Sequence, residues 1–261
     1  ASDVYKRQYP YIYLDGEKIP TYIIFSCMGA VLSVLLWNHL LFKKDLVCKY
    51  TFNIILILPG MIIGGKAFGV LSTGLRNLTV NGIFDLYGSI RQSGIVYYGG
   101  LFGALLMVYL ICRIRKQNFA DLSDILTVGI PLFHCFGRVG CFFAGCCYGV
   151  ESNSWIAFPY RVYNSQEIVK RIPVQLIEAA FELILFCFLL RLYYCYEKNK
   201  TIAQNLLDIY LLSYAIFRFV IEIWRGDEIR GKFGVISFSQ IISLVVISYM
   251  ILKIVIRRRR E

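Results

Sequence analysis

Seven apolar stretches, each close to the length of a transmembrane helix, constrain this chain more than any other feature. A helix needs about 20 mostly apolar residues to cross the roughly 30 Å hydrocarbon core of a bilayer. With 57% hydrophobic residues among 261, the chain is too apolar for a soluble domain. We predict an all-α integral membrane protein, a bundle of seven transmembrane helices that forms a single membrane domain over 21–256. The predicted spans are 21–42, 51–71, 94–112, 122–142, 174–192, 205–223 and 235–256.

Basic residues predict the orientation of these spans. One set of connections holds 14 Lys and Arg in 40 residues, and the other set holds 11 in 84. The positive-inside rule makes the dense set cytoplasmic, which places the N-terminus outside and the C-terminus inside. The dense set is 43–50, 113–121, 191–204 and 253–261, and the sparse set is 1–20, 72–93, 143–173 and 224–234.

The two ends of the chain need separate interpretation. Residues 1–8, ASDVYKRQ, resemble a translated remnant of a sequencing adapter and are excluded from fold reasoning, although 1–20 is otherwise an extracytoplasmic segment. The basic tail 257–261 can be interpreted as a nucleic-acid contact or as an anchor beside anionic lipid. The position after the last span, together with a net charge of +11, favours the anchor.

Polar residues inside the spans are predicted to lie at one depth. At about 1.5 Å per residue, three cations rise about 20–24 Å from the cytoplasmic ends of their spans, into the outer half of the membrane. These cations are Lys66, Arg138 and Arg218. The spans that run back place Tyr98, Gln175, Glu178 and Gln240 in the same half. Because a charge in a bilayer costs at least a few kcal/mol, such a layer predicts a functional site.

Two spans carry a polar stripe. In the sixth span the residues Tyr214, Arg218, Glu222 and Arg225 follow i, i+4, i+8 and i+11, and in the fourth His134, Arg138 and Cys141 follow i, i+4 and i+7. Arg–Glu pairs that join helices are one interpretation of these stripes. However, the four cations Lys66, Arg138, Arg218 and Arg225 face only Glu178 and Glu222. This excess favours a pocket for an anionic head group, because the arginine fork matches phosphate.

Glycines and cysteines near the polar layer leave several interpretations open. Glycines at 64–65, 99–100 and 103 allow close backbone approach, for packing or for substrate. Four of the nine cysteines cluster at 135, 141, 146 and 147, beside His134. Their spacing matches no standard zinc pattern, so packing is the favoured interpretation and a disulfide at 146 or 147 the next.

The connection 146–173 carries four aromatic residues, which suit a lid at the membrane interface or a plain surface loop. They are Trp155, Phe158, Tyr160 and Tyr163.

Six short segments, in order along nearly the whole chain, resemble the prolipoprotein diacylglyceryl transferase family of bacteria. The most specific is FGRVGCFFAG at 136–145, which is similar to the family motif GRxGNFxNGE. One match of this kind is weak, but six in order on helices of the predicted orientation are specific. The other five are IIGGKAFGVL (62–71), YYGGLFG (97–103), RIPVQLIE (171–178), YAIFRFVIEIWRGD (214–227) and GVISFSQIIS (234–243).

The resemblance implies a multi-pass enzyme of the bacterial plasma membrane. Such an enzyme transfers the diacylglyceryl group of phosphatidylglycerol to the thiol of the lipobox cysteine in a prolipoprotein signal peptide. A thioether forms at the outer face, and glycerol phosphate leaves. The implied partners are phosphatidylglycerol, the prolipoprotein signal peptide and membrane lipid, with no nucleic acid, metal or organic cofactor.

The resemblance also implies roles for particular residues. Arg138 and Arg218 are expected to face one cavity and bind phosphate, with Tyr98 at the position of the family's histidine and His134 as the alternative base. The expected substrate-binding residues are Lys66, Gly99, Gly100, Cys141, Gln175, Tyr214, Glu222, Arg225 and Gln240.

Departures from the family motifs mark this chain as a divergent, cysteine-rich branch. Tyr98 and Ile172 replace histidines, Cys141 replaces an asparagine, and Cys146 replaces a glutamate. A phenol, with a pKa of about 10, is a weaker base than an imidazole at about 6.5, so Tyr98 is expected mainly to orient substrate. His134 can act as the base or simply bond a neighbouring helix.

A lipid-binding paralogue, without catalysis or with a different acceptor, is the alternative function. A small-solute transporter is less supported, because the chain shows no internal repeat and its polar residues are off-centre.

Overall fold

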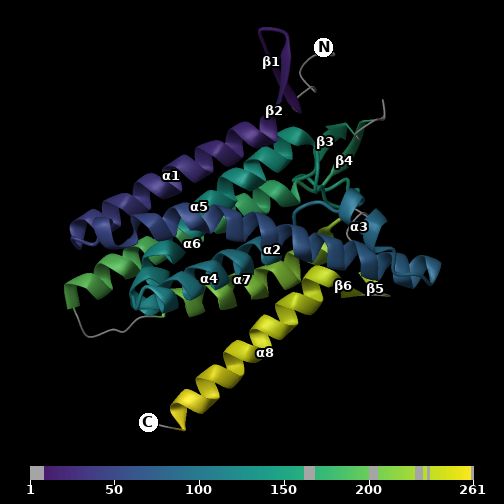
Figure 1. The fold of residues 1–261 in the computed structure, drawn as a ribbon. Helices are drawn as coiled ribbons and strands as arrows, with labels where there is room; N and C mark the ends of the chain where they lie inside the picture. The colour runs from purple at the N-terminus through teal and green to yellow at the C-terminus, as the bar shows by residue number, and fades with distance from the viewer. Residues whose placement is uncertain (1–8, 162–167, 200–204, 227–231, 234–235, 260–261) are drawn as a thin grey trace. The chain divides into compact units, whose positions relative to one another are not determined.

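The computed structural model describes residues 9–161, 168–199, 205–226, 232–233 and 236–259, which are mostly helical (Figure 1). The helices are α1 (Thr21–Lys43), α2 (Val47–Asn81), α3 (Leu86–Gln92), α4 (Tyr97–Ile114), α5 (Phe119–Ala144), α6 (Val174–Asn199), α7 (Leu206–Ile221) and α8 (Phe238–Arg258). A 3-10 turn, Glu222–Trp224, follows α7. Three antiparallel hairpins join β1 (Tyr11–Leu14) to β2 (Glu17–Pro20), β3 (Phe158–Arg161) to β4 (Ile168–Arg171), and β5 (Lys232–Phe233) to β6 (Ile236–Ser237). The prediction of an all-α chain therefore omitted these hairpins.

Five helices within the described residues are long and apolar enough to cross a membrane. They are α1, the 53–79 part of α2, α4, α5 and α8, and each corresponds to a predicted span. The other two predicted spans are also helical. However, α7 has only 16 residues, and the first 18 residues of α6 include Glu178, Glu182 and Arg191. The protein is thus an integral membrane protein of mostly helical structure.

The predicted connection 72–93 is largely helical instead. α2 continues to Asn81, where Gly82 closes it with a left-handed φ of 71° and donates its N–H to the carbonyl of Leu78. Glycine enters this conformation without steric cost, which makes it a common helix terminator. α3 follows, capped by the Asp85 side chain, which accepts from the N–H of Gly88.

The chain divides into two compact units. The first contains β1, β2, α1 as far as His39, α5 from Leu126 onward, β3, β4, α6 and the segment from Ile223. Its helices α1 and α5 run side by side (Figure 1), joined by two side chains of α1. Ser33 donates to the carbonyl of Gly129, and the Trp37 indole donates to that of Leu126. These bonds satisfy polar groups that would otherwise be stranded in an apolar layer.

The second unit contains α2, α3, α4, α7, α8 and the β5–β6 hairpin. α2 packs along α4 through glycines, and a Cβ added at Gly64 would lie only 2.3 Å from the carbonyl oxygen of Gly99. Gly103 makes the same kind of contact with Gly60. Small residues let two membrane helices approach until their backbones touch. α7 packs against α8, where Lys253 pairs with Asp208 at 2.6 Å.

Candidate active site

A buried cluster of four ionisable side chains lies between α5 and α6 in the first unit. Its members, which we call the α5–α6 cluster, are His134, Arg138, Glu178 and Glu182. Arg138 is 4% exposed, and its Nη2 lies 2.7 Å from Oε1 of Glu178. The predicted meeting of His134 and Arg138 on one face of the fourth span is confirmed. The spacing i, i+4 brings both side chains to the same side of α5.

The hydrogen bonds of this cluster determine the tautomer of His134. Nε of Arg138 can only donate, and it lies 3.2 Å from Nε2 of His134. Nε2 is therefore the acceptor, and Nδ1 carries the proton, which it donates to Oε1 of Glu182 at 2.8 Å. Consequently, His134 could take a proton at Nε2 only after Arg138 releases that nitrogen.

Glu182 was not among the residues predicted for the site. Its signal was present, since it stands four residues after Glu178 and therefore on the same face of α6. With Glu182 included, the excess of cations inferred from the sequence is smaller. Glu178 lies beside Arg138, and Glu182 lies beside His134.

A second polar cluster, which we call the α7–α8 cluster, lies within the second unit. Its members are Tyr98, Arg218, Glu222, Ser239 and Ser243. Arg218 is 2% exposed, and its Nη2 lies 2.6 Å from Oε2 of Glu222 and 3.3 Å from Oγ of Ser239. The hydroxyls of Tyr98 and Ser243 are hydrogen-bonded at 2.7 Å. The predicted stripe of α7 is confirmed as far as Glu222.

Tyr98 belongs to an aromatic group as well as to the α7–α8 cluster. Its ring centroid lies 5.4 Å from that of Tyr214, which stacks on Tyr210 at 6.0 Å. The hydroxyls of Tyr97 and Tyr210 are also hydrogen-bonded to each other. The position of the family's histidine is thus occupied by a phenol that is buried, stacked and hydrogen-bonded.

Arg225 departs from the predicted stripe. The helix α7 ends at Ile221, the 3-10 turn follows, and Arg225 pairs in extended conformation with Gly149 within the first unit. The prediction that Arg225 shares a helical face with Arg218 is therefore wrong. Its role in substrate binding stays a prediction.

Three other predicted site residues make contacts that hold the fold. Lys66 donates from Nζ to the carbonyl of Ser93 at 2.7 Å. Gln240 forms a capping box with Ser237 at the start of α8, and such reciprocal bonds satisfy the first amides of a helix. The third, Gly99, is buried at the contact of α2 with α4, next to the buried Gly100. Contact of these residues with substrate stays a prediction.

Gln175 is fully buried and fixes the turn that follows α5. Its Nε2 donates to the carbonyl of Cys146 at 2.5 Å and to the hydroxyl oxygen of Tyr160 at 2.6 Å. Burial raises the pKa of Tyr160, which keeps the phenol protonated. The burial of Tyr160 also removes it from any lid surface, whereas Trp155 is 95% exposed and Tyr163 lies outside the described residues.

The thiols of Cys141, Cys146 and Cys147 lie together, with Sγ atoms within 4.8 Å of one another. The favoured interpretation, buried packing, fits Cys141 but is wrong for Cys146, which is exposed. His134 is bonded within the α5–α6 cluster instead. The eight cysteines whose side chains are described form no disulfide with one another.

Comparisons with known proteins identify the family of this chain. The family model described as prolipoprotein diacylglyceryl transferase matches residues 11–256. A phosphatidylglycerol–prolipoprotein diacylglyceryl transferase of Clostridium tetani is 29% identical over 240 residues, which cover 90% of this chain and 91% of that protein. A second such enzyme of Clostridium perfringens is 31% identical, covering 89% and 88%. That of Rickettsia felis is 34% identical, covering 80% and 79%. The chain belongs to the prolipoprotein diacylglyceryl transferase family, whose members reside in the bacterial plasma membrane.

Proposed function

We propose that this protein transfers the diacylglyceryl group of phosphatidylglycerol to the lipobox cysteine thiol of a prolipoprotein at the outer face of the plasma membrane. Family membership over residues 11–256 is the observation that supports the reaction and both substrates. In the transfer, the thiolate sulfur forms a bond to the glycerol carbon while that carbon's bond to phosphate oxygen breaks. Glycerol phosphate leaves with the electron pair, and the thiol proton passes to a base or to water.

Two buried arginines support a role in stabilising the leaving phosphate. Arg138 and Arg218 are each held by a glutamate in a nearly dry environment. Hydrogen bonds to a charged group are stronger than neutral ones, and preorganised cations stabilise charge that develops in a transition state. We propose that both arginines bind the phosphate, which requires that it compete with Glu178 and Glu222 for their guanidinium groups.

The acceptor thiol must react as thiolate. We propose that Tyr98 orients the thiol or the glycerol, since its hydroxyl is fixed by Ser243 at 2.7 Å. His134 is the alternative base, and its Nε2 is already engaged by Arg138 at 3.2 Å. This hydrogen bond disfavours proton transfer to His134. It favours a thiol that Tyr98 orients and that the positive charge of the two arginines stabilises as thiolate.

We further propose seven membrane spans, with the N-terminus outside and the C-terminus in the cytoplasm. α6 and α7 would complete the set, because Glu178, Glu182 and Arg218 are paired in buried clusters instead of facing lipid. Ionisable residues inside membranes are tolerated where they pair with one another. The orientation rests on the density of Lys and Arg in the connections.

Replacement of the two arginines tests the phosphate role. Arg138→Ala and Arg218→Ala should each abolish transfer from phosphatidylglycerol vesicles to a lipobox peptide, with membrane insertion unchanged. Lysine at either position should restore only part of the rate, because an ammonium cannot form the bidentate fork. Lys253→Ala is the matched control, since it removes an exposed cation paired with Asp208. Full activity of both alanine variants would refute the phosphate role.

The phenol at the histidine position favours one second candidate, a lipid-binding paralogue that does not catalyse transfer. The same preparation distinguishes the two. Binding of phosphatidylglycerol without any transfer by the unaltered protein would favour the paralogue.

A further inference from the structure

Three cysteines gather where α5 ends, within the first unit. Cys141 is buried in the last turn of the helix, Cys147 is half-buried, and Cys146 is exposed. Their three Sγ atoms lie within 4.8 Å of one another. We call them the cysteine triad. Close packing of apolar side chains does not account for a group of thiols that is open on one side.

The backbone after α5 turns so that the thiols of Cys146 and Cys147 lie close to the thiol of Cys141. Gly145 and Cys147 both have left-handed φ angles, 72° and 62°. The amide of Cys146 donates to the carbonyl of Cys141 at 3.2 Å, and Gln175 holds the Cys146 carbonyl from α6. A left-handed residue other than glycine is strained, and such strain concentrates at functional sites.

This arrangement suits a thiophilic cation. Zinc binds thiolates at about 2.3 Å in tetrahedral geometry, which places the sulfurs about 3.8 Å apart. The three sulfurs lie within 4.8 Å of one another, so they need to approach by at most about 1 Å to reach that spacing. Three thiolates and Zn²⁺ leave one net negative charge, and the exposed Cys146 keeps that side of the group open to solvent. We propose that Cys141, Cys146 and Cys147 bind one Zn²⁺ ion and leave its fourth coordination position open.

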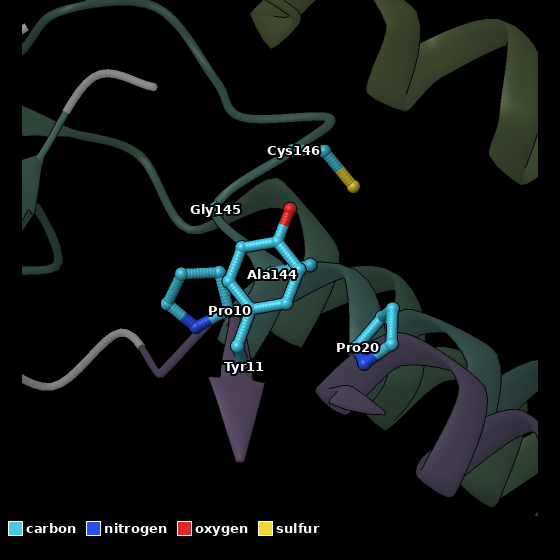
Figure 2. Close-up of a pocket in the computed structure, with 6 residues that line it drawn as sticks. All are labelled: Pro10, Tyr11, Pro20, Ala144, Gly145 and Cys146. Carbon is cyan, nitrogen blue, oxygen red and sulfur yellow. The ribbon is translucent and has the colours of Figure 1, made fainter. Parts of the chain in front are cut away.

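A pocket of about 280 Å³ adjoins the exposed member of the triad (Figure 2). Besides Cys146, its lining residues are Pro10, Tyr11, Pro20, Ala144 and Gly145. Figure 2 shows the Cys146 sulfur above two proline rings and the Tyr11 ring, which line the pocket. Zinc sites with three protein ligands keep the fourth position for water or substrate. An apolar pocket beside that position fits the side chains that flank an acceptor cysteine.

The occupant we assign to the open position is the acceptor thiol, an assignment that rests on the proposed function. A thiol that coordinates zinc is deprotonated, so its proton passes to water and the sulfur stays bound as thiolate. That sulfur then forms the bond to the glycerol carbon as the carbon–oxygen bond to phosphate breaks. The metal thus supplies the thiolate in a branch where the phenol of Tyr98 stands in place of the family's histidine.

Absorption of bound Co²⁺ tests both parts of the proposal, metal binding by the triad and coordination of the acceptor thiol. The purified full chain in detergent, reduced with a phosphine and freed of metal by a chelator, is titrated with Co²⁺. One equivalent should give an intense sulfur-to-cobalt charge-transfer band that one equivalent of Zn²⁺ removes. Cys146→Ser should lose the band and fold normally, because the side chain is exposed. Cys187→Ser, an exposed cysteine in α6, should keep it. A lipobox peptide with one cysteine should shift the band, and its serine counterpart should not.

Transfer to the peptide from phosphatidylglycerol vesicles completes the test. Zn²⁺ should raise the rate of the metal-free protein, and Cys146→Ser should lower it by at least about tenfold. Absence of the band in the unaltered protein refutes the site, as does loss of two thiols to a disulfide that reductant restores. A normal band with a rate insensitive to chelator and to Cys146→Ser refutes the assigned occupant. If no preparation transfers lipid, the proposed function fails, and the cobalt band still decides the metal site.

Discussion

At the scale of single residues, the role of a side chain depends on which of its atoms are already engaged. His134 bonds with both ring nitrogens, to Arg138 and to Glu182, whereas Tyr98 has its hydroxyl on Ser243. A hydroxyl hydrogen bond can be exchanged for substrate by rotation of Ser243. Release of the His134 Nε2 requires a buried arginine to move. Both side chains are buried, so the difference is that the Tyr98 hydroxyl is released by the smaller movement.

Comparison of two variants tests this difference. Tyr98→Phe should lower turnover by a factor of about 10², the cost of a misplaced reacting group, and Tyr98→His should retain activity by restoring the family residue. His134→Ala should have a milder effect on the rate with the same lipid. An inactive His134→Ala beside a normal Tyr98→Phe would contradict this assignment and move the chemistry to α5.

Glu182 gives a further residue-scale prediction. Because it accepts the proton of His134 Nδ1 at 2.8 Å, we infer that it is a positioning residue that fixes the ring for Arg138. Glu182→Gln keeps an acceptor and should retain most activity, while Glu182→Leu should lower the rate about as much as His134→Ala does. A structural role alone would change the melting temperature of both variants in proportion to their rates. The expected result is that rate and melting temperature diverge for Glu182→Leu.

At the scale of elements, the contact of α2 with α4 depends on the absence of Cβ atoms. A Cβ at Gly64 would lie 2.3 Å from a backbone oxygen, and backbone atoms cannot rotate away. Gly64→Ala should therefore destabilise the protein by about 1–3 kcal/mol. The measurement is thermal unfolding in detergent. Gly137→Ala is the control, because no atom lies within 4 Å of its added Cβ, and a helical Gly→Ala change should stabilise by about 0.5–1 kcal/mol. Equal stability of both variants would refute the close contact.

The sequence predicted elements better than it predicted the partners of side chains. The five apolar helices were predicted because their length and composition alone determine them. The capping role of Gln240 was also readable, since Ser237 precedes it by three residues in the capping-box pattern. The cysteine triad was not, because it depends on left-handed turns at Gly145 and Cys147 that spacing does not reveal. Likewise, the bond from Lys66 to Ser93 depends on the end of a distant connection.

At the scale of the whole molecule, the orientation in the membrane is the remaining prediction. Seven spans and the distribution of Lys and Arg place the C-terminus in the cytoplasm. A reporter enzyme that is active only in the periplasm should be silent when fused after Arg260 or inserted at 200–204. The same reporter inserted at 162–167 should be active. Equal signals at 162–167 and 200–204 would show that α6 does not cross, and activity after Arg260 would reverse the orientation.

The length of α2 makes bilayer thickness a control on this enzyme. The apolar part of α2 has 27 residues, about 40 Å of helix, against a hydrocarbon core of about 30 Å. Hydrophobic mismatch of this size is relieved by tilting. Because glycines join α2 tightly to α4, which carries Tyr98, any tilt of α2 is transmitted to the phenol. Turnover in vesicles should therefore vary with the acyl-chain length of the host lipid and reach a maximum at one thickness. The membrane would then regulate the enzyme mechanically as well as supply its lipid substrate.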